Sequence, residues 1–166
     1  MMRMLGLLVG MMAAGASATE WTDSFGDEGG FRATGAHPYW SLTPGHAVTL
    51  KGTEGKDTIV LIISVLPETR TVTGVVCRVV EERESVNGKL VEISRNFFAI
   101  GNRTGSVYYF GEDVDNYKDG KIADHGSAWL AGDKGAKPGI FLPGLPLLGS
   151  RFYQEIAPGE AMDRGE

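Results

Sequence analysis

Short apolar runs alternate with glycine, proline and asparagine along the whole chain. The densest run, residues 57–66, is rich in β-branched side chains and is followed by Pro67, as is typical of a β-strand. Its nearly continuous apolar character predicts a strand that is covered on both faces. No window combines helical spacing of apolar residues with a capping residue. The pattern therefore predicts an all-β protein with little helix.

The pair Asn87-Gly88 is the strongest turn signal, because a two-residue type I′ turn needs positive φ at both positions. The segments on either side of it, residues 73–86 and 89–100, both have the composition of long strands. We therefore expect a long β-hairpin at the centre of the chain.

The register of this hairpin follows from its turn. If Val86 pairs with Lys89, then Arg83 lies opposite Glu92 on the neighbouring strand. An opposite-charge pair across an antiparallel ladder contributes about 0.2–1 kcal/mol, which favours this register.

Further strand-like segments follow at the spacing of a meander. They are expected at residues 46–52, 106–110, 114–117, 121–123, 128–131 and 151–156. Asp119-Gly120 is a second hairpin signal, and residues 132–149, which are rich in proline and glycine, are expected to form a loop or crossover. Short strands separated by turns predict an antiparallel meander that forms an open barrel or a sandwich.

The N-terminus has the layout of a secretory signal peptide. Residues 1–18 contain one arginine, an apolar run of about ten residues and the small-residue cleavage pattern Ala-Ser-Ala. The apolar run is too short to cross a bilayer. Residues 19–36 have neither the periodicity of a helix nor that of a strand and are expected to form a flexible arm. Residues 37–166 are expected to form a single antiparallel β domain. This organisation predicts an exported protein, periplasmic or extracellular, without stable membrane insertion.

The composition narrows the classes of partner. The 166 residues carry 16 Lys and Arg against 21 Asp and Glu, a formal net charge of −5, and one cysteine. Without a basic run the chain lacks a surface for phosphate backbones, so no nucleic-acid partner is expected. One cysteine forms no internal disulfide and no cysteine-rich zinc site.

Carboxylates crowd one hairpin end and make Asp113, Asp115 and Asp119 candidates for a calcium site, because Ca²⁺ prefers oxygen ligands. The EF-hand spacing fails, since a start at Asp115 puts Tyr117 at the third ligand position. The alternative is a solvated hairpin end held by turn hydrogen bonds. The chain also has three histidines, none at short ligand spacing from another: His37, His46 and His125. The sequence therefore favours a protein without metal or other cofactor, with calcium as the alternative.

An aromatic stretch supplies the candidate ligand site. Tyr108 and Phe110 lie on one face of a strand that leads to Glu112, and Trp129 follows shortly after. An apolar wall with a few polar groups suits a small molecule at the mouth of a barrel, although aromatic strands also fill cores. No nucleophile elbow or other coherent catalytic set accompanies these residues, so no catalytic residue is assigned.

Three motifs carry a resemblance to a known family. They are Tyr108-Tyr109-Phe110-Gly111-Glu112-Asp113, Trp129-Leu130-Ala131-Gly132 and Gly135-Ala136-Lys137-Pro138-Gly139. In this order they resemble a family of uncharacterised exported bacterial β-rich proteins, over residues 38–166. The resemblance implies secretion and a β architecture, and no activity or catalytic residue transfers with it. Similar proteins continue into further strands, so the chain resembles a member with a shortened C-terminal part, whose unpaired edge strand would favour a homo-oligomer.

Three functions are compatible with this pattern. The first is an exported non-catalytic β protein that binds a small molecule or a protein partner. The second is a small periplasmic enzyme of the hydrolase or isomerase type, with Glu112 or Glu92 as a base in an aromatic pocket. The third is a structural or interaction module that pairs through an edge strand. A pocket of about 300 Å³ whose ionisable groups have perturbed pKa values favours the enzyme, and a filled interior with a long exposed edge strand favours the module.

Overall fold

The computed structural model describes residues 21–27 and 29–165, which form strands, turns and loops without a helix. The thirteen strands are β1 (Phe31–Arg32), β2 (Ala36–His37), β3 (Trp40–Ser41), β4 (Ala47–Glu54), β5 (Asp57–Val72), β6 (Val75–Val86), β7 (Lys89–Gly101), β8 (Val107–Lys118), β9 (Lys121–Asp124), β10 (Trp129–Leu130), β11 (Gly139–Leu142), β12 (Phe152–Tyr153) and β13 (Arg164–Gly165). All pairs of these strands are antiparallel. The prediction of an all-β antiparallel protein is confirmed.

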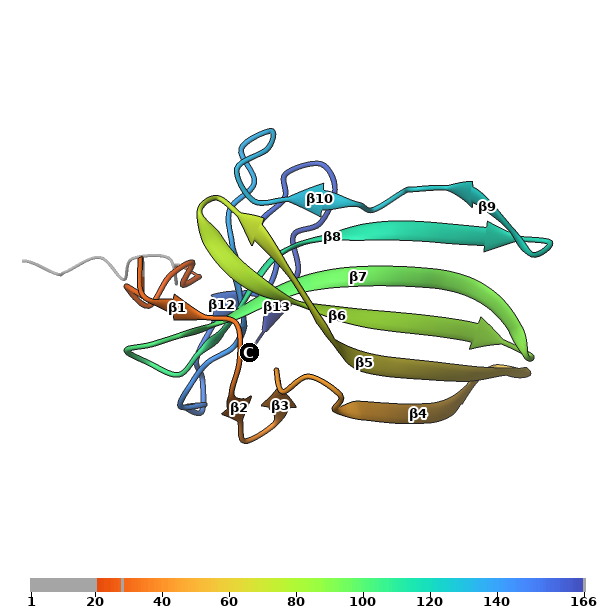
Figure 1. Cartoon of the computed structure of the whole chain (residues 1–166), viewed down its shortest axis with the longest axis horizontal. Helices are drawn as coiled ribbons and strands as arrows, with labels where there is room; N and C mark the ends of the chain where they lie inside the picture. The colour runs from red at the N-terminus through yellow and green to blue at the C-terminus, as the bar shows by residue number, and fades with distance from the viewer. Residues whose placement is uncertain (1–20, 28, 166) are drawn as a thin grey trace, which may run out of the picture.

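One large sheet dominates the molecule (Figure 1). Its strands follow the order β10-β8-β7-β6-β5-β4, with β9 and β11 also on β8 and β1 on β7. The pairs β2–β3 and β12–β13 form two small sheets of their own. The large sheet ends at β4 and, over the described residues, does not close into a barrel. Within the described chain, no helix exists that is long and apolar enough to span a bilayer.

The core lies where the short strands cover one half of the large sheet. Trp40 from β3 and Phe141 from β11 both pack against Phe98 of β7, with ring centroids 5.5 and 4.9 Å away. Tyr109 of β8 stacks on the same Phe98 ring at 4.7 Å. Phe98 and Tyr109 are buried and Trp40 and Phe141 partly buried, and burial of such side chains is favourable, so this cluster holds the small strands on the sheet.

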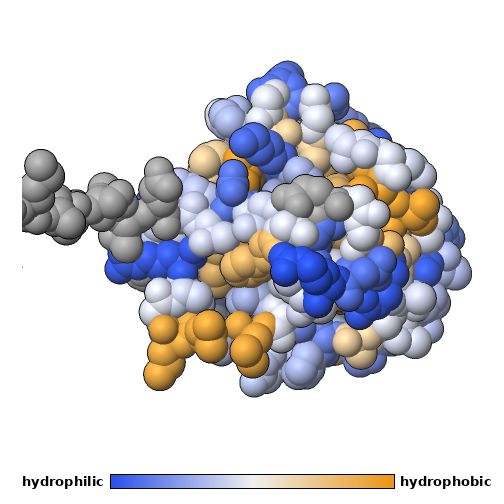
Figure 2. Space-filling view, turned by 90° about the vertical axis from the view of Figure 1, so that its left-hand side faces the viewer, coloured by the Kyte–Doolittle hydropathy of each residue, from blue (hydrophilic) through white to orange (hydrophobic). Residues whose placement is uncertain are grey.

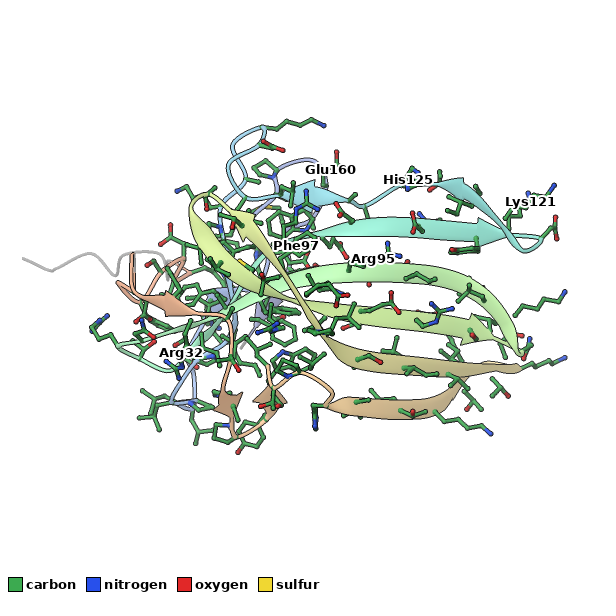
Figure 3. All side chains as sticks on the ribbon, viewed as in Figure 1. Arg32, Arg95, Phe97, Lys121, His125 and Glu160 are labelled. Atoms are coloured by element: carbon green, nitrogen blue, oxygen red, sulfur yellow. The ribbon has the colours of Figure 1, made fainter. Side chains whose placement is uncertain are left out.

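The other half of the large sheet is a single layer, which we call the blade. It consists of β4, β9 and residues 57–64, 81–86, 89–95 and 113–118. Figure 3 shows side chains projecting on both sides of the blade without a second layer of strands. Ile62, in the run that was predicted to be covered on both faces, is 39% exposed. That prediction is wrong, because no layer of the described chain covers the blade.

The predicted central hairpin is confirmed at its turn. Asn87 and Gly88 have φ values of 52° and 78°, and Val86 pairs with Lys89. Both central residues therefore adopt the left-handed conformation that a type I′ turn requires.

A β-bulge at Val91 changes the register beyond the turn. Val91 has no opposite residue, so each later residue of β7 is displaced by one position along β6. Arg83 consequently faces Ile93, and the predicted Arg83–Glu92 pair is wrong.

The segment predicted as a flexible arm, residues 19–36, is attached to the sheet where the structure describes it. β1 pairs with β7, with Phe31 opposite Gly101. Asp27 is 3% exposed and accepts hydrogen bonds from residues on the β7–β8 turn. These contacts hold the segment on the domain, which its irregular sequence did not indicate. The predicted signal peptide, residues 1–18, lies outside the described residues.

Candidate functional site

A second β-bulge divides the predicted ligand site in two. Tyr108 and Phe110 point to one side of β8, where both make edge contacts with the ring of Phe31. Gly111 has a φ of 123° and lies at a register shift in the β7–β8 ladder. This bulge turns Glu112 to the other side of β8. The structure therefore does not bring Tyr108 and Phe110 together with Glu112.

Tyr108 and Phe110 line an open hollow of about 440 Å³ together with Phe31 and Val75. Both aromatic side chains are nevertheless almost fully buried, and the Tyr108 hydroxyl donates to Asp27 at 3.2 Å. This half of the predicted site belongs largely to the core.

Glu112 lies instead beside Tyr109, Trp129 and Glu155. Trp129 is the cross-strand neighbour of Glu112, and its ring packs edge-on against Tyr109 at 5.3 Å. The Tyr109 hydroxyl donates to Asn96 Oδ1 at 2.5 Å and also contacts the Glu112 carboxylate. Burial first and the charge of Glu155 second raise the pKa of Glu112 to about 7. Burial and Asp163 raise the pKa of Glu155, which follows β12, to about 7 as well.

Glu112 belongs to a row of carboxylates that we call the acidic face. Its members lie on one side of β6, β7 and β8: Glu82, Glu84, Glu92 and Glu112. Burial raises the pKa of Glu82, with further contributions from Glu92 and Glu84, and the pKa of Glu92 is raised by burial and Glu84. No lysine, arginine or histidine among the described residues forms a salt bridge with any of the four. The acidic face therefore carries negative charge that the described chain does not neutralise.

The opposite side of the same strands is electrostatically balanced, and we call it the ion-paired face. Its contacts are Arg70–Asp113, Arg95–Asp115 (3.1 Å), Arg95–Glu81 (3.6 Å), Arg83–Glu81 (3.5 Å) and His125–Asp115 (3.0 Å). In Figure 3, Arg95 lies in the middle of the blade and His125 between β9 and β10. Within β6, β7 and β8, the carboxylates without an ion pair therefore all lie on the acidic face.

The three calcium candidates do not converge. Asp113 and Asp115 are paired with arginines on the ion-paired face, and Asp119 forms the β8–β9 turn with a φ of 52°. Among the described residues, no group of three or more His, Cys, Asp or Glu side chains could hold a metal ion. His37 serves the fold, since it is buried against the Pro143 carbonyl at 3.0 Å.

The blade also carries an apolar groove that sequence reasoning missed. One hollow of about 360 Å³ lies between the β2–β3 pair and β4–β5, and another of about 300 Å³ continues along β4 and β5. The two hollows share Leu50, and we call them together the β4 groove. Its apolar walls are Trp40, Val48, Leu50, Ile59, Leu61 and Ile63.

The β4 groove lies beside the acidic face. Leu61 is the cross-strand neighbour of Glu84, and Ile63 is that of Glu82. Directly opposed residues of a ladder point to the same side of a sheet. The alternation of Val48 and Leu50 with polar residues was the signal in the sequence, but it does not reveal whether another layer covers these side chains.

Other exposed apolar side chains lie away from the groove. Figure 2 faces the end of the molecule opposite the blade and shows apolar residues gathered along its lower part. The loop between β11 and β12 contributes three strongly exposed leucines: Leu145, Leu147 and Leu148. This loop is attached next to the β7–β8 turn, where the Gly144 amide donates to Ser106. It forms a separate surface from the β4 groove.

Comparison with known proteins identifies neither a family nor a function for the chain. No family model, curated protein or solved structure matches the chain. The resemblance to exported bacterial β-rich proteins therefore remains a prediction from the three motifs.

The raised pKa of Glu112 predicts a pH-dependent effect of the change Glu112→Gln. A carboxyl group whose pKa rises from 4.5 to about 7 on folding costs stability progressively as the pH rises through this interval. Glutamine removes that cost. The free energy of unfolding of Glu112→Gln, compared with that of the wild type, should therefore be about 2 kcal/mol more favourable at pH 8 than at pH 4.5, after allowance for partial exposure. Urea unfolding at the two pH values measures the difference.

The matched control is Asp113→Asn, the next residue along β8 but on the ion-paired face. Because Asp113 is paired with Arg70, this change should give no gain in unfolding free energy at pH 8. An equal loss of stability by Glu112→Gln at both pH values would contradict the predicted cost of its charge.

Proposed function

We propose that this chain is an exported, non-catalytic β protein that binds a protein partner through the β4 groove and the acidic face. The observation that carries this proposal is that the β4 groove and the acidic face lie on the same uncovered side of the blade. Export is inferred from residues 1–18 alone, which have the layout of a signal peptide.

The shape of the groove supports an extended protein segment as the partner. The two hollows follow the direction of β4 and β5 and meet at Leu50. Leu50 is 52% exposed and Val48 39% exposed, which leaves apolar surface for a partner to cover. Alternate side chains of an extended segment can fill such a groove while its backbone follows the strands.

The acidic face supports a basic partner. Glu84 and Glu92 are direct neighbours in the ladder, so two negative charges lie side by side next to the groove. Like charges placed directly opposite each other are destabilising, and a lysine or arginine of the partner would relieve this repulsion. We therefore expect a segment that combines apolar with basic side chains.

A small-molecule site is the second candidate. The hollow beside Tyr108 and Phe110, at about 440 Å³, is within the range of ligand pockets. Lys137, which also lines it, would suit an anionic apolar ligand, although it already lies 3.8 Å from Asp23.

An enzyme is less well supported. Glu112 has a pKa near 7, as general acid–base catalysis requires. Neither Glu112 nor Glu92 lines the β4 groove or the hollow beside Tyr108. A substrate in either place would therefore lie away from the proposed base.

Titration with a peptide of alternating valine and lysine residues tests the proposal. We expect NMR signals of the β4 groove, including the methyl groups of Val48 and Leu50, to shift on addition of the peptide. The change Val48→Glu should weaken binding by about tenfold, because it puts a charge into the apolar groove.

The matched control is Ile62→Glu, on the opposite side of the blade. Ile62 and Val48 are both 39% exposed, so the two changes add the same charge at equal exposure. Affinity should be unchanged by Ile62→Glu. Equal weakening by both changes, or shifts confined to the hollow beside Tyr108 and Phe110, would overturn the proposed site.

A further inference from the structure

β4 is an unprotected sheet edge. All eight of its residues are exposed, and it pairs with β5 on one side only, without a register shift. Its sequence, Ala-Val-Thr-Leu-Lys-Gly-Thr-Glu, has no proline and one internal charge, Lys51. Proteins usually block such an edge with proline, bulges, several charges or a covering loop, because it otherwise pairs with another strand.

The ladder determines which backbone groups of β4 face outward. The Val65 amide donates to the His46 carbonyl and the Val65 carbonyl accepts from the Gly45 amide, both at 2.9 Å, so the backbone groups of Val65 point toward the strand that contains β4. Hydrogen-bonded and non-hydrogen-bonded residues alternate along an antiparallel strand. The residues whose N–H and C=O groups point away from β5 are therefore Ala47, Thr49, Lys51 and Thr53.

We propose that this edge pairs with β4 of a second copy of the chain, antiparallel, with Leu50 opposite Leu50 of the second copy. The proposal concerns the strand edge, and it therefore goes beyond the groove and the acidic face that form the proposed partner site.

Of the registers that match outward-facing residues with one another, three place the two-fold axis near the middle of β4, and the side chains distinguish them. Pairing Lys51 with Lys51 of the second copy opposes two positive charges. Pairing Thr49 with Thr49 of the second copy leaves the end of β4 beyond Lys51 unpaired. Pairing Leu50 with Leu50 of the second copy joins two apolar side chains, places each Lys51 opposite a Thr49 and engages β4 from Ala47 to Thr53. Charge and apolar contact both favour this last register.

The resulting dimer has one continuous sheet. Four outward-facing residues from each copy form about eight backbone hydrogen bonds across the two-fold axis. Because the axis is perpendicular to the sheet, both copies present the same side in the same direction. The two β4 grooves then meet at the pair of Leu50 side chains and form one longer apolar surface.

Disulfide trapping tests the register. Leu50 would be in a non-hydrogen-bonded pair, where opposite Cα atoms lie about 4.5 Å apart and a disulfide can form. We expect Leu50→Cys to give a covalent dimer under mild oxidation, and the control Lys51→Cys to give none. The native Cys77 should not interfere, because it is buried and burial raises the pKa of its thiol to about 12. A covalent dimer of Lys51→Cys but not of Leu50→Cys would overturn the register.

Sedimentation equilibrium of the chain without added cysteines tests the dimer itself. Thr49→Pro removes an outward N–H without removing a β4–β5 hydrogen bond, and should raise the dimer dissociation constant at least about tenfold. Thr49→Val keeps the N–H and should leave the constant unchanged. A wild type that stays monomeric at the highest soluble concentration would overturn the dimer, even if the valine–lysine peptide still shifts the groove signals. A dimer whose groove does not respond to that peptide would instead overturn the proposed function alone.

Discussion

The change Gly111→Ala is expected to lower the free energy of unfolding by about 3–5 kcal/mol. Gly111 has a φ of 123°, a conformation that side chains with a Cβ rarely adopt. A Cβ at this position would lie 2.3 Å from the Trp129 carbonyl oxygen and 2.8 Å from the Leu130 Cα. The positive φ costs about 1–3 kcal/mol of backbone strain. The forced displacement of β10 has a similar cost, and the two costs together give the expected loss.

Urea unfolding of the variant measures this loss, and Gly52→Ala is its control. Gly52 lies in exposed β4, its φ is negative, and an added Cβ meets no atom within 4 Å. Gly52→Ala should therefore leave the free energy of unfolding nearly unchanged. If Gly111→Ala were as mild as Gly52→Ala, neither the positive φ of Gly111 nor the close approach of β10 would constrain this position.

The turns and strands were predictable because their signals are local. Asn87-Gly88 and Asp119-Gly120 both adopt positive φ at both positions, as the two hairpin predictions require. Each of these pairs needs only its own backbone preferences to form a tight turn. The strands on either side then follow from runs of β-branched and aromatic residues.

The faces of the strands were not predictable to the same degree, because a bulge reverses them. Strict alternation along β8 puts Glu112 beside Phe110, but the bulge at Gly111 places Glu112 with Tyr109. The bulge at Val91 likewise replaced an expected charge pair with Arg83 opposite Ile93. A bulge depends on how one strand fits its neighbours, and the sequence of a single strand does not report that fit.

Coverage of the sheet is a second property that the local pattern does not report. The apolar run in β5 was expected to lie between two layers, yet Leu61 and Ile63 line an open groove. Hydrophobicity predicts that a side chain will leave water, and it does not say whether the surface that covers it belongs to the same chain. The candidate site was missed for this reason.

The largest effect in the N-terminal segment is expected from Asp27→Ala, which should cost about 3–5 kcal/mol of unfolding free energy. The buried carboxylate accepts hydrogen bonds from the backbone amides of Arg103 and Thr104, both at 3.1 Å, and from the Thr104 and Tyr108 hydroxyl groups. Alanine removes the acceptor of the Arg103 and Thr104 amides, and each unsatisfied group costs about 1–3 kcal/mol before the site relaxes. The segment around Asp27 should also become sensitive to limited proteolysis.

Two substitutions separate the hydrogen bonds of Asp27 from other effects. Asp27→Asn keeps the volume and one acceptor oxygen for the two amides, so its cost should be less than half that of Asp27→Ala. Asp23→Ala removes an exposed carboxylate whose contact with Lys137 spans 3.8 Å, and should change the unfolding free energy by less than about 0.5 kcal/mol. If Asp27→Ala were as mild as Asp23→Ala, residues 21–36 would not be anchored by this carboxylate. The flexible arm predicted from the sequence would then be the better description of the segment, because its pairing through β1 comprises only two residues.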